Sequence, residues 1–585
     1  MKKIRIAQIG TFDCENMGDL LFPFVLEKAA CTAESDILVD IFSPIGGKMP
    51  FSPERPVFKI RELGRMHHEN PYNAFVIGGG DLIRLDSEVA SKEKYNTLDA
   101  TLWLWVYPII LGFLERVPVL FNAPGVPFRF LEKQSEVVRY LLELTDYVAV
   151  RDVQSREFLL DSGFNGNIQV VPDTVNLVGD LFPKECLPFE SLYEKLPEAK
   201  EETYVCFQLN SLEGRDKLNE YAEVIRQLHL RKNCQVYLMP IGYVHDDVSV
   251  LSEIYDYVSC KMDYVRMIHE KLTPFEMMAL LSNASAFVGT SLHGSVISFS
   301  YGVPILAINN SHLSKIDGFY SMINAQERVC ASIHDVQKKI EYIDTPCNYE
   351  KYRVTKQVRN HFDWLFYKAN TKKENSEEDI LGLMSNIILG KRALLSSSVY
   401  WKGNKEEFTQ EKSAPLHVRR FEKNHYDFER VSLPADTYSL RFDPCDGYEC
   451  AVVLNARATT NLGQFILNPV GADFSGKYVF FPTNDPQMVF NTDEPIAWVE
   501  FSADILPLSA EPATEILCEA IRSRAVIDTE NQKNESKISV LNDTVNALRR
   551  ENQENESKIS VLDDTVNALR RENQENESKI SVLDD

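Results

Sequence analysis

The sequence has few of the features that mark secreted, membrane-spanning or nucleic-acid-binding proteins. Its 11 cysteines are dispersed and none forms a C-x-x-C pair, which predicts reduced thiols in a cytoplasmic protein. No stretch reaches the roughly 18 apolar residues of a membrane span, and the longest candidate, residues 101–120, contains Pro108, Glu115 and Arg116. Positive charge is outnumbered too, because 86 Asp and Glu residues against 62 Lys and Arg residues give a formal net charge of −24. That excess of negative charge argues against coating of nucleic acid or anionic membranes.

Residues 1–178 alternate short apolar runs with helical stretches. The runs are rich in β-branched and aromatic residues, as strands are. The alternation predicts a domain of right-handed βαβ units around a parallel sheet. The expected strands are residues 4–9, 37–42, 74–77, 117–121, 147–150 and 168–171.

A second α/β series occupies residues 203–395. Residues 179–202 before it are acidic, contain proline and show no clear period, so we expect a linker. The fold class is therefore α/β, with two Rossmann-like domains facing a cleft in a GT-B-like arrangement and helices over 350–395 bracing them. The expected strands here are residues 204–209, 235–240, 286–288 and 305–308.

Residues 396–512 show a different hydrophobic pattern from the two α/β series. Short alternating segments are separated by turn residues such as Asp446-Gly447 and Asn461-Leu462-Gly463. This pattern predicts an antiparallel β-sandwich module. Glycan binding and simple packing are both open as its role.

A sequence of 21 residues repeats through residues 530–585, the main part of a segment at 520–585. Since 21 residues are three heptads, the hydrophobic register survives from copy to copy, which predicts a parallel coiled coil and a homo-oligomer. A single solvated helix is the alternative. The two seam positions hold Ile538, Val545, Ile559, Val566 and Ile580, and Leu541, Leu548, Leu562, Leu569 and Leu583.

Two turns of the first domain follow predicted strands. The segment Gly10–Asp19 (GTFDCENMGD) and the turn Gly78-Gly79-Gly80-Asp81 are rich in glycine, asparagine and aspartate. Glycine lets backbone amides approach a ligand closely, and a helix beginning near Gly18 offers free N–H groups to an anion. An ordinary tight turn, with Asp19 as a helix cap, is the alternative.

Two further motifs carry groups suited to anionic ligands. Arg151 follows a predicted strand and can bind a phosphate or carboxylate bidentately, unless it forms a surface pair with Asp152. Residues 288–305 (VGTSLHGSVISFSYGVPI) predict a strand, a small-residue turn, a helix and a strand. His293 stands where that helix begins, where it can bind an anion or act as general acid or base. A structural histidine is the alternative.

Together these motifs resemble the polysaccharide pyruvyl transferase family over residues 4–325. The resemblance rests on N-x-G-D, G-G-G-D, R-D-x-x-S, P-D-T at Pro172-Asp173-Thr174, His245-Asp246-Asp247 and T-S-L-H-G, in that order. Many members carry arginine two residues before the histidine, where this chain has Ser291. His245 and its two neighbours could instead hold a divalent ion or cap a helix.

The resemblance implies transfer of pyruvate from phosphoenolpyruvate to a glycan or lipid-linked glycan, giving a pyruvate ketal without a cofactor or a metal. A glycosyltransferase using a nucleotide-sugar and a non-catalytic scaffold are the alternatives. His293 would be the general acid or base. The residues implied to hold the donor are Arg151, Thr290, Ser291, Gly294 and Lys315. Those implied on the acceptor side are Asn16, Gly18, Asp19, Gly79, Gly80, Asp81 and His245.

Overall fold

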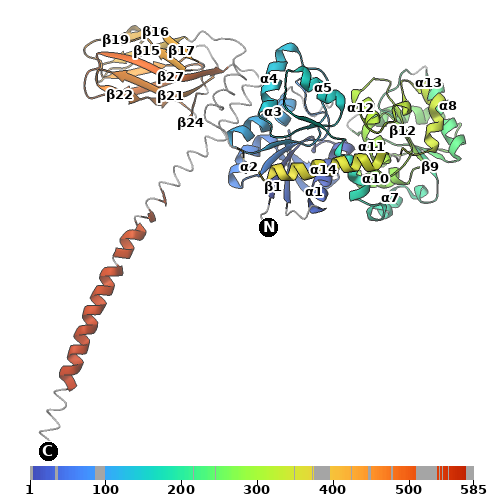
Figure 1. The fold of residues 1–585 in the computed structure, drawn as a ribbon, viewed down its shortest axis with the longest axis horizontal. Coiled ribbons are helices and arrows are strands. Elements are labelled where there is room, and N and C mark those ends of the chain that lie inside the picture. Colours follow the sequence, from blue (N-terminus) through green and yellow to red (C-terminus); the bar gives the residue numbers. More distant parts are fainter. Residues whose placement is uncertain are drawn as a thin grey trace, which may run out of the picture. The chain divides into compact units, whose positions relative to one another are not determined.

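The described part of the chain comprises two α/β lobes, a β-sheet module and a C-terminal helix (Figure 1). It divides into two compact units, Met1–Arg524 and Ala525–Asp585. No described helix is both long enough and apolar enough to cross a membrane. The structure is a computed structural model that describes residues 4–32, 37–85, 99–214, 217–243, 246–347, 350–371, 373, 396–422, 425–445, 450–472, 474–475, 478–481, 483–508, 537–538, 541–542, 544–550 and 552–574.

The first lobe is built on a mainly parallel sheet of strand order β3-β4-β2-β1-β5-β6. Its central strands are apolar and buried, as strands covered on both faces must be. The sequence predicted the parallel strands but missed β3 and β4, whose prolines and charges hide the strand pattern, and β3 runs antiparallel at the edge. The strands are β1 (Ile4–Ile9), β2 (Ile37–Ser43), β3 (Gly47–Met49), β4 (Ser52–Lys59), β5 (Ala74–Ile77) and β6 (Val119–Phe121).

A two-stranded parallel pair, β7 (Val148–Val150) and β8 (Ile168–Val170), extends this lobe through a bridge between Leu120 and Tyr147. The lobe's helices are α1 (Met17–Thr32), α2 (Leu63–Glu69), α3 (Asp99–Leu114), α4 (Glu132–Glu143) and α5 (Val153–Asp161), and the 3₁₀ turn η2 (Thr174–Leu177) follows β8.

The connection between the lobes is helical rather than an irregular linker. Its segments bury Leu192 and Ala199 in the main core, and Glu276 of the second lobe accepts hydrogen bonds from Ser191 and Lys195. Short amphipathic turns have too few residues for a clear period, so the sequence hid them. They are α6 (Val178–Leu181), η3 (Lys184–Cys186), α7 (Phe189–Lys195) and η4 (Pro197–Lys200).

The second lobe has an all-parallel sheet of order β11-β10-β9-β12-β13-β14, which is the 3-2-1-4-5-6 order of a dinucleotide-fold sheet. The expected strands and helices are present within a few residues, and β11 and β14 are additions. The strands are β9 (Tyr204–Gln208), β10 (Gln235–Leu238), β11 (Val265–Met267), β12 (Ala286–Gly289), β13 (Ile305–Ile308) and β14 (Val329–Cys330). The helices are α8 (Leu218–Lys232), α9 (Asp247–Val258), α10 (Pro274–Asn283), α11 (Leu292–Ser300), α12 (Ser314–Met322) and α13 (Ile333–Lys339).

Helix α14 (Lys351–Ala369) follows the second lobe and packs back against the first (Figure 1). His361 at its centre contacts Asn122, which follows β6, through a 3.0 Å hydrogen bond. The predicted bracing helix is therefore present within residues 350–395, of which 374–395 lie outside the described residues.

The β module contains two antiparallel sheets, of orders β16-β15-β20-β26-β23 and β17-β18-β27-β21-β25-β24. Phe442 of the first sheet stacks on Phe501 of the second at 4.6 Å, within one shared core. This face-to-face packing is the predicted sandwich. The strands are β15 (Ser397–Lys402), β16 (Ser413–Leu416), β17 (Val418–Glu422), β18 (His425–Phe428), β19 (Val431–Ser432), β20 (Ser439–Asp443), β21 (Cys450–Thr460), β22 (Gly463–Ile466), β23 (Asn468–Val470), β24 (Phe474–Ser475), β25 (Tyr478–Phe481), β26 (Gln487–Asn491) and β27 (Trp498–Leu508).

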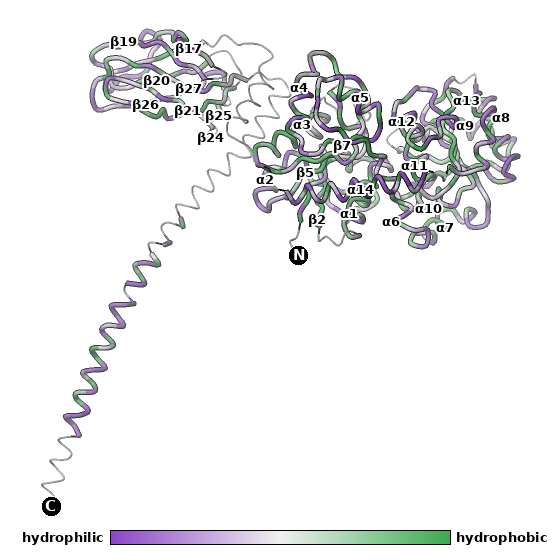
Figure 2. The backbone as a smooth tube through the Cα atoms, in the orientation of Figure 1, coloured by the Kyte–Doolittle hydropathy of each residue, from purple (hydrophilic) through white to green (hydrophobic). Residues whose placement is uncertain are grey.

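The described residues of the C-terminal unit are helical, and Figure 2 shows hydrophobic residues recurring along them between hydrophilic ones. The seam side chains that are described are exposed in this single chain, for example Leu548 at 59 % and Leu562 at 63 %. Ile580 and Leu583 lie outside the described residues. Because a leucine seam gains stability only when it is covered, the coiled coil remains a prediction that a second copy would fulfil.

We expect substitution of Leu562 by aspartate to dissociate or weaken the oligomer, because a charge would be buried in the seam. Val561 is equally exposed, at 65 %, but lies off the seam, so Val561→Asp serves as the matched control and leaves the mass unchanged. Analytical ultracentrifugation of the full chain measures both. A monomeric wild type, or equal behaviour of the two variants, contradicts the prediction.

Candidate functional site

The motifs of both lobes lie at the carboxyl ends of central strands. In the first lobe the strand order reverses between β1 and β5, which precede Gly10–Asp19 and Gly78–Asp81. In the second lobe the order reverses between β9, which ends at Gln208, and β12, which precedes Thr290. Open α/β sheets bind ligands at such reversal points. The sheet topology therefore gives each lobe one expected ligand-binding edge, and the motifs occupy both.

The first-lobe segment Gly10–Asp19 forms a polar cluster at the start of α1. Asp19 accepts hydrogen bonds from Thr11 Oγ1 at 2.8 Å and from Asn16 Nδ2 at 2.9 Å. Burial raises the pKa of Asp19, although His293 and the Thr11 hydrogen bond oppose that rise. The backbone of Asn16 forms a β-bridge with Gly242 of the second lobe. Asn16 and Asp19 therefore lie where the lobes meet.

The glycine turn after β5 fits closely against α1. Gly79 and Gly80 have φ values of +91° and +75°, which side chains with a Cβ rarely adopt. A Cβ on Gly79 would lie 2.0 Å from the ring of Phe22, and one on Gly80 would lie 3.1 Å from Asp19 Oδ1. Both glycines thus allow the turn to bring Asp81 beside the cluster.

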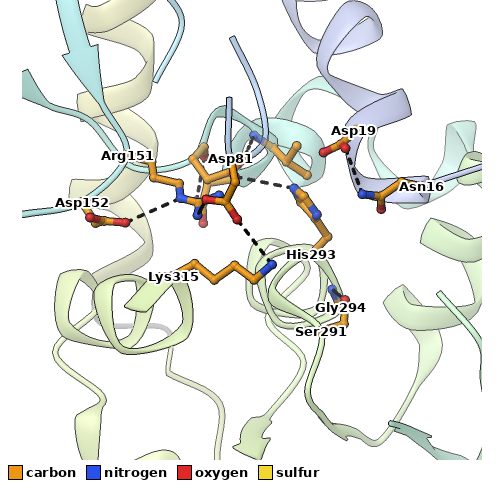
Figure 3. Close-up of polar contacts among 12 residues, drawn as sticks. Asn16, Asp19, Asp81, Arg151, Asp152, Ser291, His293, Gly294 and Lys315 are labelled. Carbon is orange, nitrogen blue, oxygen red and sulfur yellow. Dashed lines mark hydrogen bonds and ion pairs between the residues drawn. The ribbon is translucent and has the colours of Figure 1, made fainter. Parts of the chain in front are cut away.

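Asp81 joins two cations from different lobes (Figure 3). Arg151, at the end of β7, donates a hydrogen bond to Asp81 Oδ1, while Lys315 Nζ of α12 lies 3.5 Å from Asp81 Oδ2. Burial favours a higher pKa for Asp81, but Arg151 and Lys315 outweigh it and hold that pKa below its usual value. Arg151 is only 6 % exposed, so it is not part of a surface pair. The predicted donor cations are brought together, with a carboxylate between them.

Helix α12 is placed by its contact with the start of α5. Asp152 caps α5, because its Oδ1 accepts a hydrogen bond from Ser155 N at 2.7 Å. A Cβ on Gly318 would lie 2.8 Å from Asp152 Cβ, so α12 approaches this cap with backbone only. That close packing brings Lys315 within reach of Asp81.

His293 lies between the lobes. Its ring covers Gly18 so closely that a Cβ there would be 1.8 Å from Nδ1, and Phe22 meets it edge to face at 5.7 Å. Nε2 lies 3.6 Å from Asp173 Oδ2. Both atoms are buried and have no hydrogen-bond partner within the described part of the chain. Such orphaned polar atoms are uncommon and point to a functional group.

Asp173 is the residue whose place in the site the sequence did not predict. Its Oδ1 accepts a hydrogen bond from Val175 N at 2.9 Å and so caps η2. The other carboxylate oxygen, Oδ2, is the one near His293. The Pro172-Asp173-Thr174 motif was the available signal, but nothing in the sequence links it to a histidine 120 positions later.

The small-residue turn before α11 uses its own hydrogen-bonding groups. Gly294 N donates to Ser291 Oγ at 3.2 Å, and Thr290 N donates to Gln208 Oε1 at 3.0 Å. The expectation that these two amides hold an anion therefore does not fit this conformation, because a side-chain cap and a neighbouring strand already engage them.

The acidic pair after β10 has a structural use. Asp247 Oδ2 accepts hydrogen bonds from Gln208 Nε2 and from the amides of Ile241 and Gly242, at 2.8, 3.0 and 3.1 Å. His245 lies outside the described residues. Among the described residues no group of three or more His, Cys, Asp or Glu side chains is arranged to hold a metal ion.

We expect Gly18→Ala to destabilise the protein by about 1–3 kcal/mol, because the added methyl group must displace the ring of His293. In a His293→Ala background the same change should cost far less, since the ring is gone. Midpoints of urea unfolding for the wild type, the two single variants and the double variant measure the coupling energy between Gly18 and His293. An equal cost in both backgrounds would show that Gly18 serves the helix and not the ring.

The comparisons with known proteins agree with these motifs. The sequence matches the family profile described as polysaccharide pyruvyl transferase over residues 16–312. It is 36 % identical over 73 residues to the amylovoran biosynthesis protein AmsJ of Erwinia amylovora, a stretch covering 12 % of this chain and 17 % of that protein.

Solved structures similar to the chain include enzymes that act on nucleotide-sugars. The UDP-GlcNAc 2-epimerase of Methanocaldococcus jannaschii has 13 % identity and a TM-score of 0.43, covering 63 % of this chain and 100 % of its own. The ADP-heptose heptosyltransferase II of E. coli has 11 % identity and a TM-score of 0.31, covering 58 % and 98 %. Since the family profile spans half of the sequence and includes the His293 motif, the chain belongs to the polysaccharide pyruvyl transferase family.

Proposed function

We propose that this protein transfers pyruvate from phosphoenolpyruvate to two hydroxyls of one sugar in a cell-surface polysaccharide or its precursor. One observation carries the proposal. The strand ends of the two lobes bring His293 together with two cations, Arg151 and Lys315, beside the orphaned carboxylate oxygen of Asp173. These groups meet the needs of a small, highly charged donor and a proton transfer.

The donor would be held by charge. Phosphoenolpyruvate carries a phosphate and a carboxylate, and Arg151 offers a planar fork that matches either group. Lys315 supplies a second, more mobile cation from the opposite lobe. Asp81 holds both cations in this structure, so donor binding would require the donor anion to replace this carboxylate on at least one of them.

The reaction needs a general acid and a base. Protonation of the methylene carbon of the donor gives an oxocarbenium-like centre, to which a sugar hydroxyl adds as it loses its proton. Loss of phosphate forms a second such centre, to which the neighbouring hydroxyl adds, and proximity favours this closure. One hydroxyl proton balances the proton taken up by the methyl group, and the other leaves with phosphate.

The proposed roles follow from position. His293 would exchange protons with the reacting atoms, and Asp173 would orient its ring and stabilise its charged form. Asn16 and Asp19 lie on the first-lobe side of the ring and would contact the acceptor sugar. His293 is 9 % exposed, so the proposal requires the lobes to part for substrates to reach it.

We expect His293→Gln to abolish phosphate release from phosphoenolpyruvate in the presence of glycan acceptors, because no other imidazole of the described site can replace it. His334→Gln, on the exposed face of α13 in the same lobe, is the matched control and should retain wild-type turnover. Phosphate release and mass spectrometry of the glycans measure the two products. Near-normal turnover by His293→Gln would remove this residue from catalysis. Stabilisation by UDP- or GDP-sugars but not by phosphoenolpyruvate in a thermal-shift assay would favour a glycosyltransferase instead.

We expect Asp81→Asn to tighten phosphoenolpyruvate binding about fivefold, because Arg151 and Lys315 lose their competing anion. Calorimetry in the His293→Gln background measures binding without turnover. The ionised Asp81, whose pKa is lowered, stabilises the fold above a pH of about 4, and this stability is lost as the pH falls further. The variant should therefore melt earlier at pH 7, by a difference that shrinks below pH of about 4.

Asp161 provides the matched control, because it pairs with Arg129 at the surface at 2.9 Å, with 47 % of its side chain exposed. Asp161→Asn should change neither donor affinity nor the acid dependence of melting. Weaker donor binding by Asp81→Asn would show that Asp81 supports the donor site and does not compete for it.

A further inference from the structure

A groove of about 910 Å³ lies beside α14, outside the candidate site. Helix α14 forms one wall, and the β7–β8 pair with the residues flanking it forms the other. Tyr147 lines the groove before β7, whereas Arg151 of the candidate site follows β7. Since a strand advances about 3.3 Å per residue, the two positions are more than 10 Å apart along the chain.

Trp364 presents a flat apolar surface to this groove. It is 55 % exposed, whereas its neighbour Leu365 is completely buried in the core. Tyr367 holds the indole edge to face at 5.5 Å. A large aromatic ring that is exposed inside a concave surface of mixed polar and apolar side chains is typical of a contact with a ligand that is itself partly apolar.

The rest of the lining is rich in side-chain amides and carries paired charges. An amide group donates and accepts hydrogen bonds at once, as a sugar hydroxyl does. Most of the charged groups are engaged within the protein, because Arg139 pairs with Glu143 at 3.1 Å and Asp146 with Lys373 at 2.9 Å. Lys368, which also lines the groove, has no ion pair with another described residue. The lining amides are Asn165, Asn167, Gln169, Gln357 and Asn360.

The floor of the groove is hydrogen-bonded and uncharged at His361. His361 lies between Tyr147 Oη, 2.9 Å from its Nδ1, and Asn122 Oδ1, 3.0 Å from its Nε2. Burial lowers the pKa of His361 to about 3, so the ring is neutral at ordinary pH. Asn122 in turn packs on Gly78, where a Cβ would lie 2.4 Å from Asn122 Cβ. The floor is thereby fixed to the turn that carries Asp81.

We propose that this groove binds a neutral stretch of the glycan chain, separately from the sugar that reacts. One sugar ring would stack its C–H face on Trp364, and the amides of Asn360 and Asn167 would bind its hydroxyls. A neutral occupant fits a lining in which three of the four charged side chains are already paired. The inference rests on the proposed function only in that a polysaccharide acceptor extends far beyond one sugar; glycan binding itself needs neither donor nor turnover.

The test measures binding of neutral hexasaccharides of glucose, galactose, mannose and N-acetylglucosamine to the full chain, without phosphoenolpyruvate, by glycan array and then calorimetry. We expect at least one to bind, Trp364→Ala to weaken that binding about tenfold, and Trp364→Phe to restore most of it. Tyr352→Ala is the matched control, because Tyr352 is 76 % exposed on the same helix but does not line the groove.

The outcomes separate this proposal from the proposed function. His293→Gln should leave binding of the hexasaccharide unchanged, so loss of catalysis and loss of glycan binding are independent results. Absence of binding across all four sugars overturns the groove proposal. So does equal binding by wild type and Trp364→Ala, or a preference for acidic oligosaccharides over neutral ones. In each case the phosphoenolpyruvate assays still decide the proposed function by themselves.

Discussion

The contact between the carboxylate of Asp81 and the cations Arg151 and Lys315 is the interaction on which the site depends. Arg151 comes from the first lobe and Lys315 from the second, so one carboxylate links cations of both lobes. Arg151 is almost completely buried, and a buried cation without a partner would be strongly destabilising. The arrangement therefore satisfies two cations from different lobes with one carboxylate.

His293 of the second lobe is positioned by contacts with residues of the first lobe. Gly18 has no side chain to keep the ring of His293 away from α1, and Asp173 approaches it through the turn after β8. Asp173 Oδ2 and His293 Nε2 are buried without hydrogen bonds in the described structure, which costs free energy that a purely structural pair would avoid. A pair kept in this state is consistent with a group that exchanges protons during a reaction.

The groove beside α14 would give a long glycan acceptor a second contact, away from the candidate site. A polymer offers many identical sugars, and a second contact raises the effective concentration of the reacting one near the site. A chain of hydrogen bonds joins Tyr147, His361 and Asn122. Because Asn122 packs on Gly78, this chain connects the groove with the glycine turn that carries Asp81. The C-terminal heptads predict a further increase in local acceptor contacts, because an oligomer would present several grooves.

The sequence by itself determined the central strands of both lobes, their alternation with helices, the pattern of short strands after residue 396 and the position of His293 at the start of a helix. These follow from local periodicity and from turn residues, which act within about ten positions. The sequence did not predict the edge hairpin β3–β4 or the short helices between the lobes, because their hydrophobic patterns are too short or too polar. Only the tertiary structure placed Asp173 opposite His293 and Asp81 between Arg151 and Lys315, and only it showed that the amides of Thr290 and Gly294 are engaged. Apart from the local contact between Gly294 and Ser291, these contacts join residues tens to hundreds of positions apart, and the sheet order that brings them together is not written in any local pattern.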